Sequence, residues 1–183
     1  MATPNSSQAA IGLAELGQRI CILGPSNSGK STLAAAMGDA QGLPVVHLDV
    51  VRHIPGAQWV ERDADEFGRL HDAAIDGEAW VMEGNYSRWL PQRLNRATGL
   101  IVLDVSTFTS LTRYLRRTLL ERNRHGGIEG VADRLNLRMI RWIVGQSRKN
   151  RAQYRARAHS TEIPAILLPT RKALRRFYHE EHL

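Results

Sequence analysis

The stretch Gly24-Pro25-Ser26-Asn27-Ser28-Gly29-Lys30-Ser31-Thr32 contains the complete pattern Gly-x-x-x-x-Gly-Lys-Ser/Thr of a phosphate-binding loop. The pattern is meaningful when it lies between a strand and a helix. Residues 19–23 form a short, mostly apolar run suited to a buried strand. Residues 31–36 are rich in Ala and lack Pro and Gly, which favours a helix. The sequence therefore predicts a strand, a glycine-rich turn and a helix in the required order.

Each position of this loop has a physical role. Gly24 and Gly29 can adopt backbone angles that are closed to residues with a Cβ atom, so successive N–H groups can turn inward around an anion. The N-terminus of the following helix adds positive potential. We expect Lys30 to reach the β- and γ-phosphates of a nucleotide, and the Ser31 hydroxyl to bind Mg²⁺.

Length and composition predict one domain. The chain has 183 residues, 43% of them hydrophobic, and no apolar run of about 18 residues that would span a membrane. Residues 1–10 are expected to form a frayed tail and do not resemble a secretory signal. The single cysteine, Cys21, falls in the first predicted strand and is expected to be a buried, inert thiol. Together with a nucleotide loop, this favours a cytoplasmic protein.

Positive charge is concentrated in one part of the chain. Residues 113–157 hold 13 Lys and Arg against three acids, a net charge of +10, whereas the rest of the chain is at −3. Such a stretch fits either a nucleic acid or the phosphates of two small substrates. The phosphate loop favours the second partner.

Apolar runs and helical patterns alternate along the chain. Strands are predicted at 19–23, 44–48, 78–82, 100–103 and 163–168, and helices at 31–36, 63–76, 86–96 with a break near Pro91, 108–121, 133–156 and 172–178. This order predicts an α/β domain, a three-layer fold with a five-stranded parallel sheet and helices on both faces. Right-handed crossovers place the loops that follow the strands at one edge, where ligands bind.

Four features of the chain together resemble the nucleoside-monophosphate-kinase branch of P-loop proteins, with adenylate kinase and shikimate kinase as relatives. They are the loop at 24–32, the segment His47-Leu48-Asp49, the segment from Trp80 to Tyr86, and the pair Arg113 and Arg117. The acid-Gly-Asn-Tyr sequence at 83–86 resembles the corresponding segment in a group of bacterial proteins. This group is described as adenylate-kinase-like or DNA-topology-modulation-protein-related. The resemblance implies a P-loop kinase domain that uses ATP and Mg²⁺.

The chain departs from adenylate kinase in two places. Where that family has Asp-Gly-Phe-Pro-Arg, this chain has Glu83-Gly84-Asn85-Tyr86-Ser87-Arg88, which weakens the case for AMP as the acceptor. The large lid is also missing, and only a short lid at about 122–132 is expected, as in shikimate-kinase-type enzymes.

Each acidic residue predicted at a strand end has a possible functional role and a structural alternative. Glu83 is expected to assist Ser31 in holding Mg²⁺ through a water, with a turn acid as the alternative. The resemblance to shikimate kinase implies that Asp49 orients or deprotonates an attacking hydroxyl, with a capping residue as the alternative. His47, in the same strand, is expected to be a core histidine.

Arginines are the candidates for contacts with the transferring phosphoryl group, since guanidinium groups suit bidentate phosphate contacts. We expect Arg117 first and Arg113 second in this catalytic role, with Arg122 solvated. A second basic stripe, of Arg134, Arg138 and Arg141, is expected to close over the donor, and residues 148–157 to face solvent or a polyanion. The acceptor pocket is expected to be lined by Arg88, Arg93, Trp59 and Tyr86, with core packing as the alternative for Trp59. The resemblance implies that Arg171 contacts the adenine.

These observations predict an ATP-dependent phosphotransferase that acts on a small-molecule acceptor, as a monomer or weak dimer. A nucleotide, a nucleoside, a sugar and a small acid all remain open as acceptors. The alternative is a nucleotide-binding protein that associates with nucleic acid. A switch GTPase is disfavoured because none of the three lysines, Lys30, Lys149 and Lys172, is followed two positions later by Asp.

Overall fold

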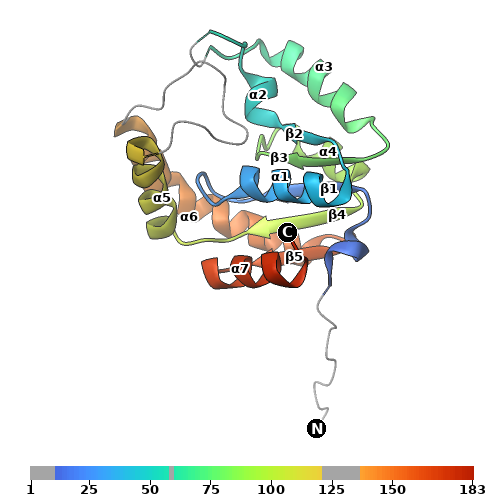
Figure 1. The fold of residues 1–183 in the computed structure, drawn as a ribbon. Coiled ribbons are helices and arrows are strands. Elements are labelled where there is room, and N and C mark those ends of the chain that lie inside the picture. The colour runs from blue at the N-terminus through green and yellow to red at the C-terminus, as the bar shows by residue number, and fades with distance from the viewer. Residues whose placement is uncertain (1–10, 58–59, 121–136) are drawn as a thin grey trace.

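The computed structural model describes residues 11–57, 60–120 and 137–183 (Figure 1). Within these ranges five strands form one parallel sheet. Its order is β2 (Val45–His47), β3 (Trp80–Glu83), β1 (Arg19–Leu23), β4 (Gly99–Leu103) and β5 (Ala165–Leu168). The sheet confirms the predicted α/β fold, and it places the strand that precedes the phosphate loop in the centre.

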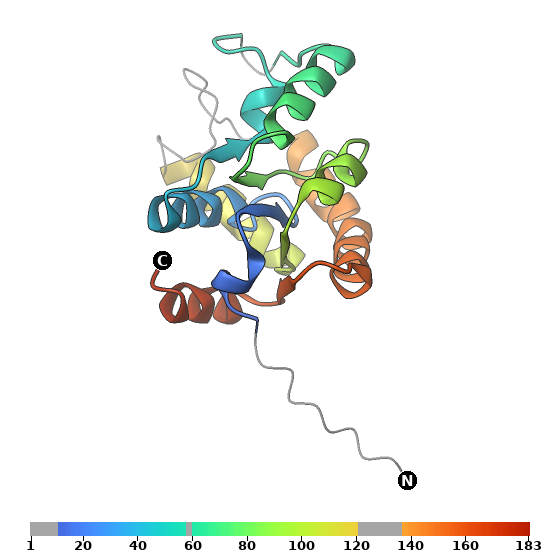
Figure 2. The same cartoon turned by 90° about the vertical axis from the view of Figure 1, so that its right-hand side faces the viewer.

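Helices cover both faces of the sheet, as Figure 2 shows in a view roughly along the strands. One face packs against η1 (Leu13–Leu16), α1 (Lys30–Gln41) and α7 (Arg171–Glu180) through a buried cluster around Ile20, Ile22 and Leu33. The other face packs against α3 (Ala64–Ile75), α4 (Leu90–Arg96) and α6 (Leu137–Ser160). Since β1 is buried from both sides, its C-terminal end is a rigid base for the loop that follows.

Local sequence signals account for most of the helix boundaries. The Asp63 carboxylate accepts hydrogen bonds from the amides of Asp65 and Glu66 and begins α3, close to its predicted start. Thr170 caps α7 in the same way through the amide of Ala173. The break predicted near Pro91 is wrong. Pro91 lies in the first turn of α4, where its missing N–H has no intrahelical partner to lose.

The second strand is shorter than predicted. It ends at His47, and α2 (Leu48–Arg52) follows at once, so Asp49 lies in the first turn of a short helix and not at a strand end. The predicted strand continued because Leu48 is apolar. In the structure Leu48 is buried against the sheet as a helical residue.

The helix that follows β4 is α5 (Thr107–Leu120), and Figure 1 shows it beside α6, beyond the edge where the phosphate loop lies. The predicted tail at 1–10, Trp59 and the predicted lid at 122–132 lie outside the described residues. None of the helices in the described part of the chain combines the length and the apolar composition that a membrane span requires.

Cys21 lies in the middle of β1 and is fully buried, as predicted. Burial raises the pKa of its thiol, against the opposing effect of the nearby Arg93 guanidinium. The thiol is therefore protonated and shielded from solvent.

Candidate active site

The phosphate loop has the backbone conformation that its glycines predict. Gly24 and Gly29 have φ angles of 151° and 102°, and Asn27 has a φ of 60°. Among the described residues, the buried Asn27 Oδ1 and Ser28 Oγ atoms have no hydrogen-bond partner. Buried polar atoms without a partner are costly, and an anion or its water shell would supply one to the Ser28 hydroxyl. The loop geometry therefore suits a nucleotide phosphate.

Lys30 belongs to this loop and is also the first residue of α1. Its ammonium group donates a hydrogen bond to the carbonyl of Pro25, with Nζ and O 3.1 Å apart. The side chain thus folds back over its own loop. This is the position from which an ammonium group can reach phosphate oxygens held by the loop amides.

Glu83 lies at the end of β3, next to β1 in the sheet, and is paired in register with Ile22. Its side chain is only 3% exposed. Its Oε1 atom lies 3.0 Å from Ser31 Oγ and 3.0 Å from His47 Nδ1. The two residues predicted to hold Mg²⁺ are therefore in direct contact.

The environment of Glu83 favours its charged form. Burial works to raise the pKa of the carboxyl group, but hydrogen bonds from His47 and Ser31 and the positive charge of Lys30 lower it below its ordinary value. His47 thus differs from the expected core histidine, because its ring is 19% exposed and it contacts Glu83. The described residues contain no group of three or more His, Cys, Asp and Glu that could hold a metal. Ser31 and the Glu83 carboxylate suit an ion such as Mg²⁺ that keeps several waters.

Asp49 faces the same site from α2. The Tyr86 hydroxyl donates a hydrogen bond to its carboxylate, with Oη and Oδ1 2.6 Å apart. Burial and the negative charge of Asp49 raise the pKa of Tyr86 well above its ordinary value, so the hydroxyl stays protonated and acts as the donor. A pocket of about 230 Å³ is lined by Ser26, Lys30, Asp49, Gly84, Asn85 and Tyr86. Residues predicted for the donor side and for the acceptor side therefore share one cavity.

Asn85 is a site residue to which no role was assigned from the sequence. Its side-chain amide donates to the Gly24 carbonyl at 2.9 Å and accepts from the Gly24 amide at 3.3 Å. The signal available in the sequence was the acid-Gly-Asn-Tyr segment itself. Nothing local indicates that this Asn pairs with the first glycine of the phosphate loop, 61 positions earlier.

The two arginines predicted to line the acceptor pocket lie elsewhere. Arg93 is fully buried, and its guanidinium donates to the carbonyls of Gly84 and Asn85, each at 2.9 Å. Arg88 is exposed, with its guanidinium carbon 5.1 Å from the centre of the Trp89 ring. Neither side chain is among those that line the pocket. The pattern of the sequence placed both near the acceptor, but α4 turns Arg93 inward.

One basic residue from α5 contacts the phosphate loop. Arg113, on α5, donates to the Ser28 carbonyl. Burial and the positive charge of Arg171 lower the pKa of the Arg113 guanidinium. The side chains of Arg117, Arg138 and Arg141, and all of Arg122 and Arg134, lie outside the described residues.

Part of the basic stretch is paired within the protein. Arg151 and Arg155, on α6, both contact the buried carboxylate of Asp104 at the end of β4, at 2.5 and 3.1 Å. The expectation that residues 148–157 face only solvent or a polyanion is therefore wrong for these two. Their spacing of four placed them on one helix face, but the acid that they contact is far away in the sequence.

No family model matches this chain, and no curated protein matches it significantly. Solved structures do. A shikimate kinase from Bacteroides thetaiotaomicron is 19% identical, with a TM-score of 0.54 over 91% of this chain and 99% of that one. A shikimate kinase from Acinetobacter baumannii, in complex with shikimate, is 17% identical, with a TM-score of 0.52 over 91% of this chain and 92% of that one.

The chain thus has the fold of the P-loop small-molecule kinases, which confirms the resemblance at the level of the fold. The narrower similarity to the DNA-topology-modulation-protein-related group stays a prediction.

Proposed function

We propose that this protein is an ATP-dependent phosphotransferase that moves the γ-phosphate to a hydroxyl group of a small molecule. The observation that carries the proposal is the shared pocket. Lys30, from the phosphate loop, and Asp49, from the opposite side, line one cavity of about 230 Å³. A phosphoryl donor and an acceptor can therefore meet there without a large movement of the described residues.

The donor half of the site is the loop at 24–32. Its amides and Lys30 bind the phosphates, and Ser31 with Glu83 holds Mg²⁺, which neutralises charge on the phosphate oxygens when bound. Arg117 and, second to it, Arg113 are proposed to stabilise the charge that develops on the transferring group. Arg171 is proposed to contact the adenine.

On the acceptor side of the site, the carboxylate of Asp49 favours a hydroxyl as the group that receives the phosphoryl group. A phosphate acceptor is already anionic, needs no base, and would be repelled by a carboxylate at the reacting position. A hydroxyl oxygen becomes a better nucleophile when a carboxylate accepts a hydrogen bond from it and orients its proton. In the proposed step the hydroxyl oxygen forms a bond to the γ-phosphorus, and the bond between the γ-phosphorus and the oxygen that bridges to the β-phosphate breaks. ADP leaves with that oxygen, and the hydroxyl proton passes to Asp49.

The size and lining of the pocket restrict the acceptor. A cavity of about 230 Å³ that also receives the transferring phosphoryl group suits a small acceptor, such as a sugar, a small hydroxy acid or a nucleoside fragment. Association with nucleic acid is the weaker proposal. Two cations of the basic stretch, Arg151 and Arg155, are paired with Asp104 and are less available to a polyanion.

The test is a screen for ADP release with ATP and Mg²⁺ against a panel of hydroxylated metabolites. For any compound that is turned over, we expect Lys30→Ala to lower the rate by about a hundredfold or more while the protein stays folded. Lys172→Ala, which changes an exposed lysine on α7, is the matched control. Turnover by Lys30→Ala at the wild-type rate would contradict the mechanism, and so would calorimetry that detects no binding of any purine triphosphate.

A further inference from the structure

We infer that the turn Gly84–Asn85–Tyr86 is a positioning element that holds the phosphate loop and the acceptor-side carboxylate in a fixed relation, with Arg93 as its buried anchor. The inference about Asp49 and the acceptor rests on the proposed function. The inference about the phosphate loop needs only nucleotide binding.

The first contact of the turn is with the phosphate loop. The Asn85 amide pairs with both backbone groups of Gly24, the first glycine of the loop. Gly24 is held from another direction as well, since a Cβ atom there would lie 2.5 Å from the Leu103 carbonyl of β4. Asn85 therefore fixes the peptide from which the loop departs, and through it the direction of the loop amides.

The second contact of the turn is with Asp49. The Tyr86 hydroxyl reaches the Asp49 carboxylate, and the Tyr86 ring lies 5.0 Å from the Phe67 ring, centre to centre. Phe67 is fully buried and meets Trp89 edge to face at 4.7 Å. Because these rings are packed, the hydroxyl has little freedom, and it restrains a carboxylate on an exposed helix turn.

The backbone of the turn is unusual enough to need an anchor. Gly84 has a φ of 128° and Tyr86 a φ of 36°, a conformation that costs a residue with a side chain on the order of 1–3 kcal/mol. A Cβ atom on Gly84 would lie 2.8 Å from Leu48 Cβ, so the turn packs directly on the start of α2. Asp49 is the next residue of that helix. A shift of the turn would therefore move Asp49.

Arg93 supplies the anchor. It is fully buried, it donates to the Gly84 and Asn85 carbonyls, and its Nε and Nη1 atoms have no hydrogen-bond partner among the described residues. A buried guanidinium with unused donors is expensive, and a core selected for stability alone would favour an apolar side chain. One of its two hydrogen bonds goes to the carbonyl that precedes the Asn85 Cα atom, and the other goes to the carbonyl that follows it. Both peptide groups of Asn85 are therefore held by Arg93. We assign Arg93 to holding that turn.

The phosphate-loop half is tested with Asn85→Ala and Mg-ADP. We expect the Kd measured by calorimetry to rise by about tenfold, since two hydrogen bonds to Gly24 are lost. We also expect faster hydrogen exchange in the peptide that contains Gly24. The matched control is Asn95→Ala, an exposed asparagine on α4. If both variants bind Mg-ADP with the wild-type Kd, the assignment of Asn85 is wrong.

The acceptor half is tested with Tyr86→Phe, which keeps the ring and removes the hydroxyl. We expect kcat to fall by about tenfold with KM for ATP unchanged, because the lost hydrogen bond restrains Asp49 and not the nucleotide. The rate is measured with the compounds turned over in the metabolite screen and with water as acceptor. An unchanged kcat, or a matching rise in KM for ATP, overturns this half.

Arg93→Lys is expected to change both the Kd for Mg-ADP and kcat, because it displaces the whole turn. Arg96→Lys, on the same helix but bound to carbonyls away from the site, is its control. Thermal unfolding of each variant separates loss of fold from loss of position. Failure of the proposed function would look different, since wild-type protein would then not transfer phosphate, whereas failure of this inference leaves wild-type activity intact and the variants active.

Discussion

Arg151 Nε lies 2.5 Å from the Oδ1 atom of Asp104, across 47 positions of the sequence. Asp104 directly follows β4, and its side chain is 3% exposed. Arg151 also donates to the Asp104 backbone carbonyl at 3.2 Å, and Arg155 contacts the second carboxylate oxygen. These contacts tie α6, seen on the right in Figure 2, to the edge of the sheet where the candidate active site lies.

Asp104→Asn is therefore expected to destabilise the protein. The change removes the buried charge that two arginines share, and we expect the free energy of unfolding to fall by about 1–3 kcal/mol. Urea unfolding measures it. Asp39→Asn, at an exposed position on α1, is the control and is expected to change stability by less than about 0.5 kcal/mol. Equal effects of the two substitutions would contradict a structural role for the ion pairs.

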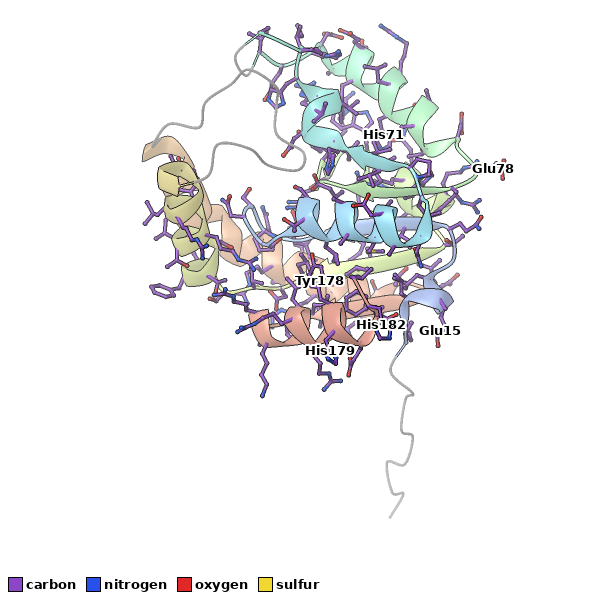
Figure 3. All side chains as sticks on the ribbon, viewed as in Figure 1. Glu15, His71, Glu78, Tyr178, His179 and His182 are labelled. Carbon is purple, nitrogen blue, oxygen red and sulfur yellow. The ribbon has the colours of Figure 1, made fainter. Side chains whose placement is uncertain are left out.

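Glu83→Gln tests the metal site. The neutral amide cannot neutralise Mg²⁺ or orient its waters as a carboxylate does, so we expect Mg²⁺ affinity or ATP turnover to fall by about 10- to 100-fold. Measuring the rate at a fixed ATP concentration and increasing Mg²⁺ concentrations separates an effect on Mg²⁺ affinity from an effect on the maximal turnover. Glu78→Gln, at an exposed position just before β3, should behave as wild type. The labelled sticks in Figure 3 show Glu78 at the surface. Unchanged Mg²⁺ dependence in Glu83→Gln would exclude the carboxylate from the site.

Two glycines are predicted to respond to alanine in opposite directions. At Gly99, a Cβ atom would lie 2.5 Å from Leu16 Cβ and 2.6 Å from the Leu16 carbonyl, so Gly99→Ala must displace η1. We expect a loss of about 1–3 kcal/mol in the free energy of unfolding.

Gly145 lies within α6, and a Cβ atom there would meet nothing within 4 Å. Gly145→Ala is therefore expected to stabilise the protein by about 0.5–1 kcal/mol through helix propensity. Denaturant midpoints of the two variants check both signs. A stabilising Gly99→Ala would mean that η1 does not pack on β4 in solution.

The burial of the Tyr154 hydroxyl leads us to expect a loss of stability at alkaline pH. Burial raises the pKa of its hydroxyl from 10.0 to about 12, against the opposing effect of the Arg93 charge. The unfolded chain then loses this proton at lower pH than the folded protein. The stability contributed by Tyr154 is present below pH 10 and is lost as the pH rises toward 12.

The shift corresponds to about 2–3 kcal/mol at most, since one pKa unit is about 1.4 kcal/mol. Unfolding free energies of wild type and Tyr154→Phe at a series of pH values measure it. The variant should lose less stability between pH 10 and 12. Parallel curves for the two proteins would show that Tyr154 titrates alike in both states.

Much of the fold was predictable because its signals are local. The five apolar runs gave five strands, and Asp63 and Thr170 mark helix starts by capping chemistry that acts over three residues. The errors were also local. The run through Leu48 looked like one strand, yet α2 begins there, because burial of an apolar side chain is equally possible in either conformation.

The site was predictable where a motif contains its own geometry. Residues 24–32 carry their loop shape in two glycines, and Glu83 follows from its place at a strand end. By contrast, the inward turn of Arg93 and the pairing of Asn85 with Gly24 depend on how α4 and β3 pack against β1. Residue types and spacings do not contain that information.

The amino-acid sequence was thus sufficient for the phosphate loop, the α/β order and the residue types offered to a nucleotide, since these depend on neighbours within a few positions. Folding in three dimensions set which partners those residues acquired: Glu83 with Ser31 and His47, Tyr86 with Asp49, and Arg151 with Asp104. The reason is physical. A hydrogen bond needs two atoms at about 3 Å, and across 36 to 52 positions of chain only the packing of the sheet and its helices brings atoms that close.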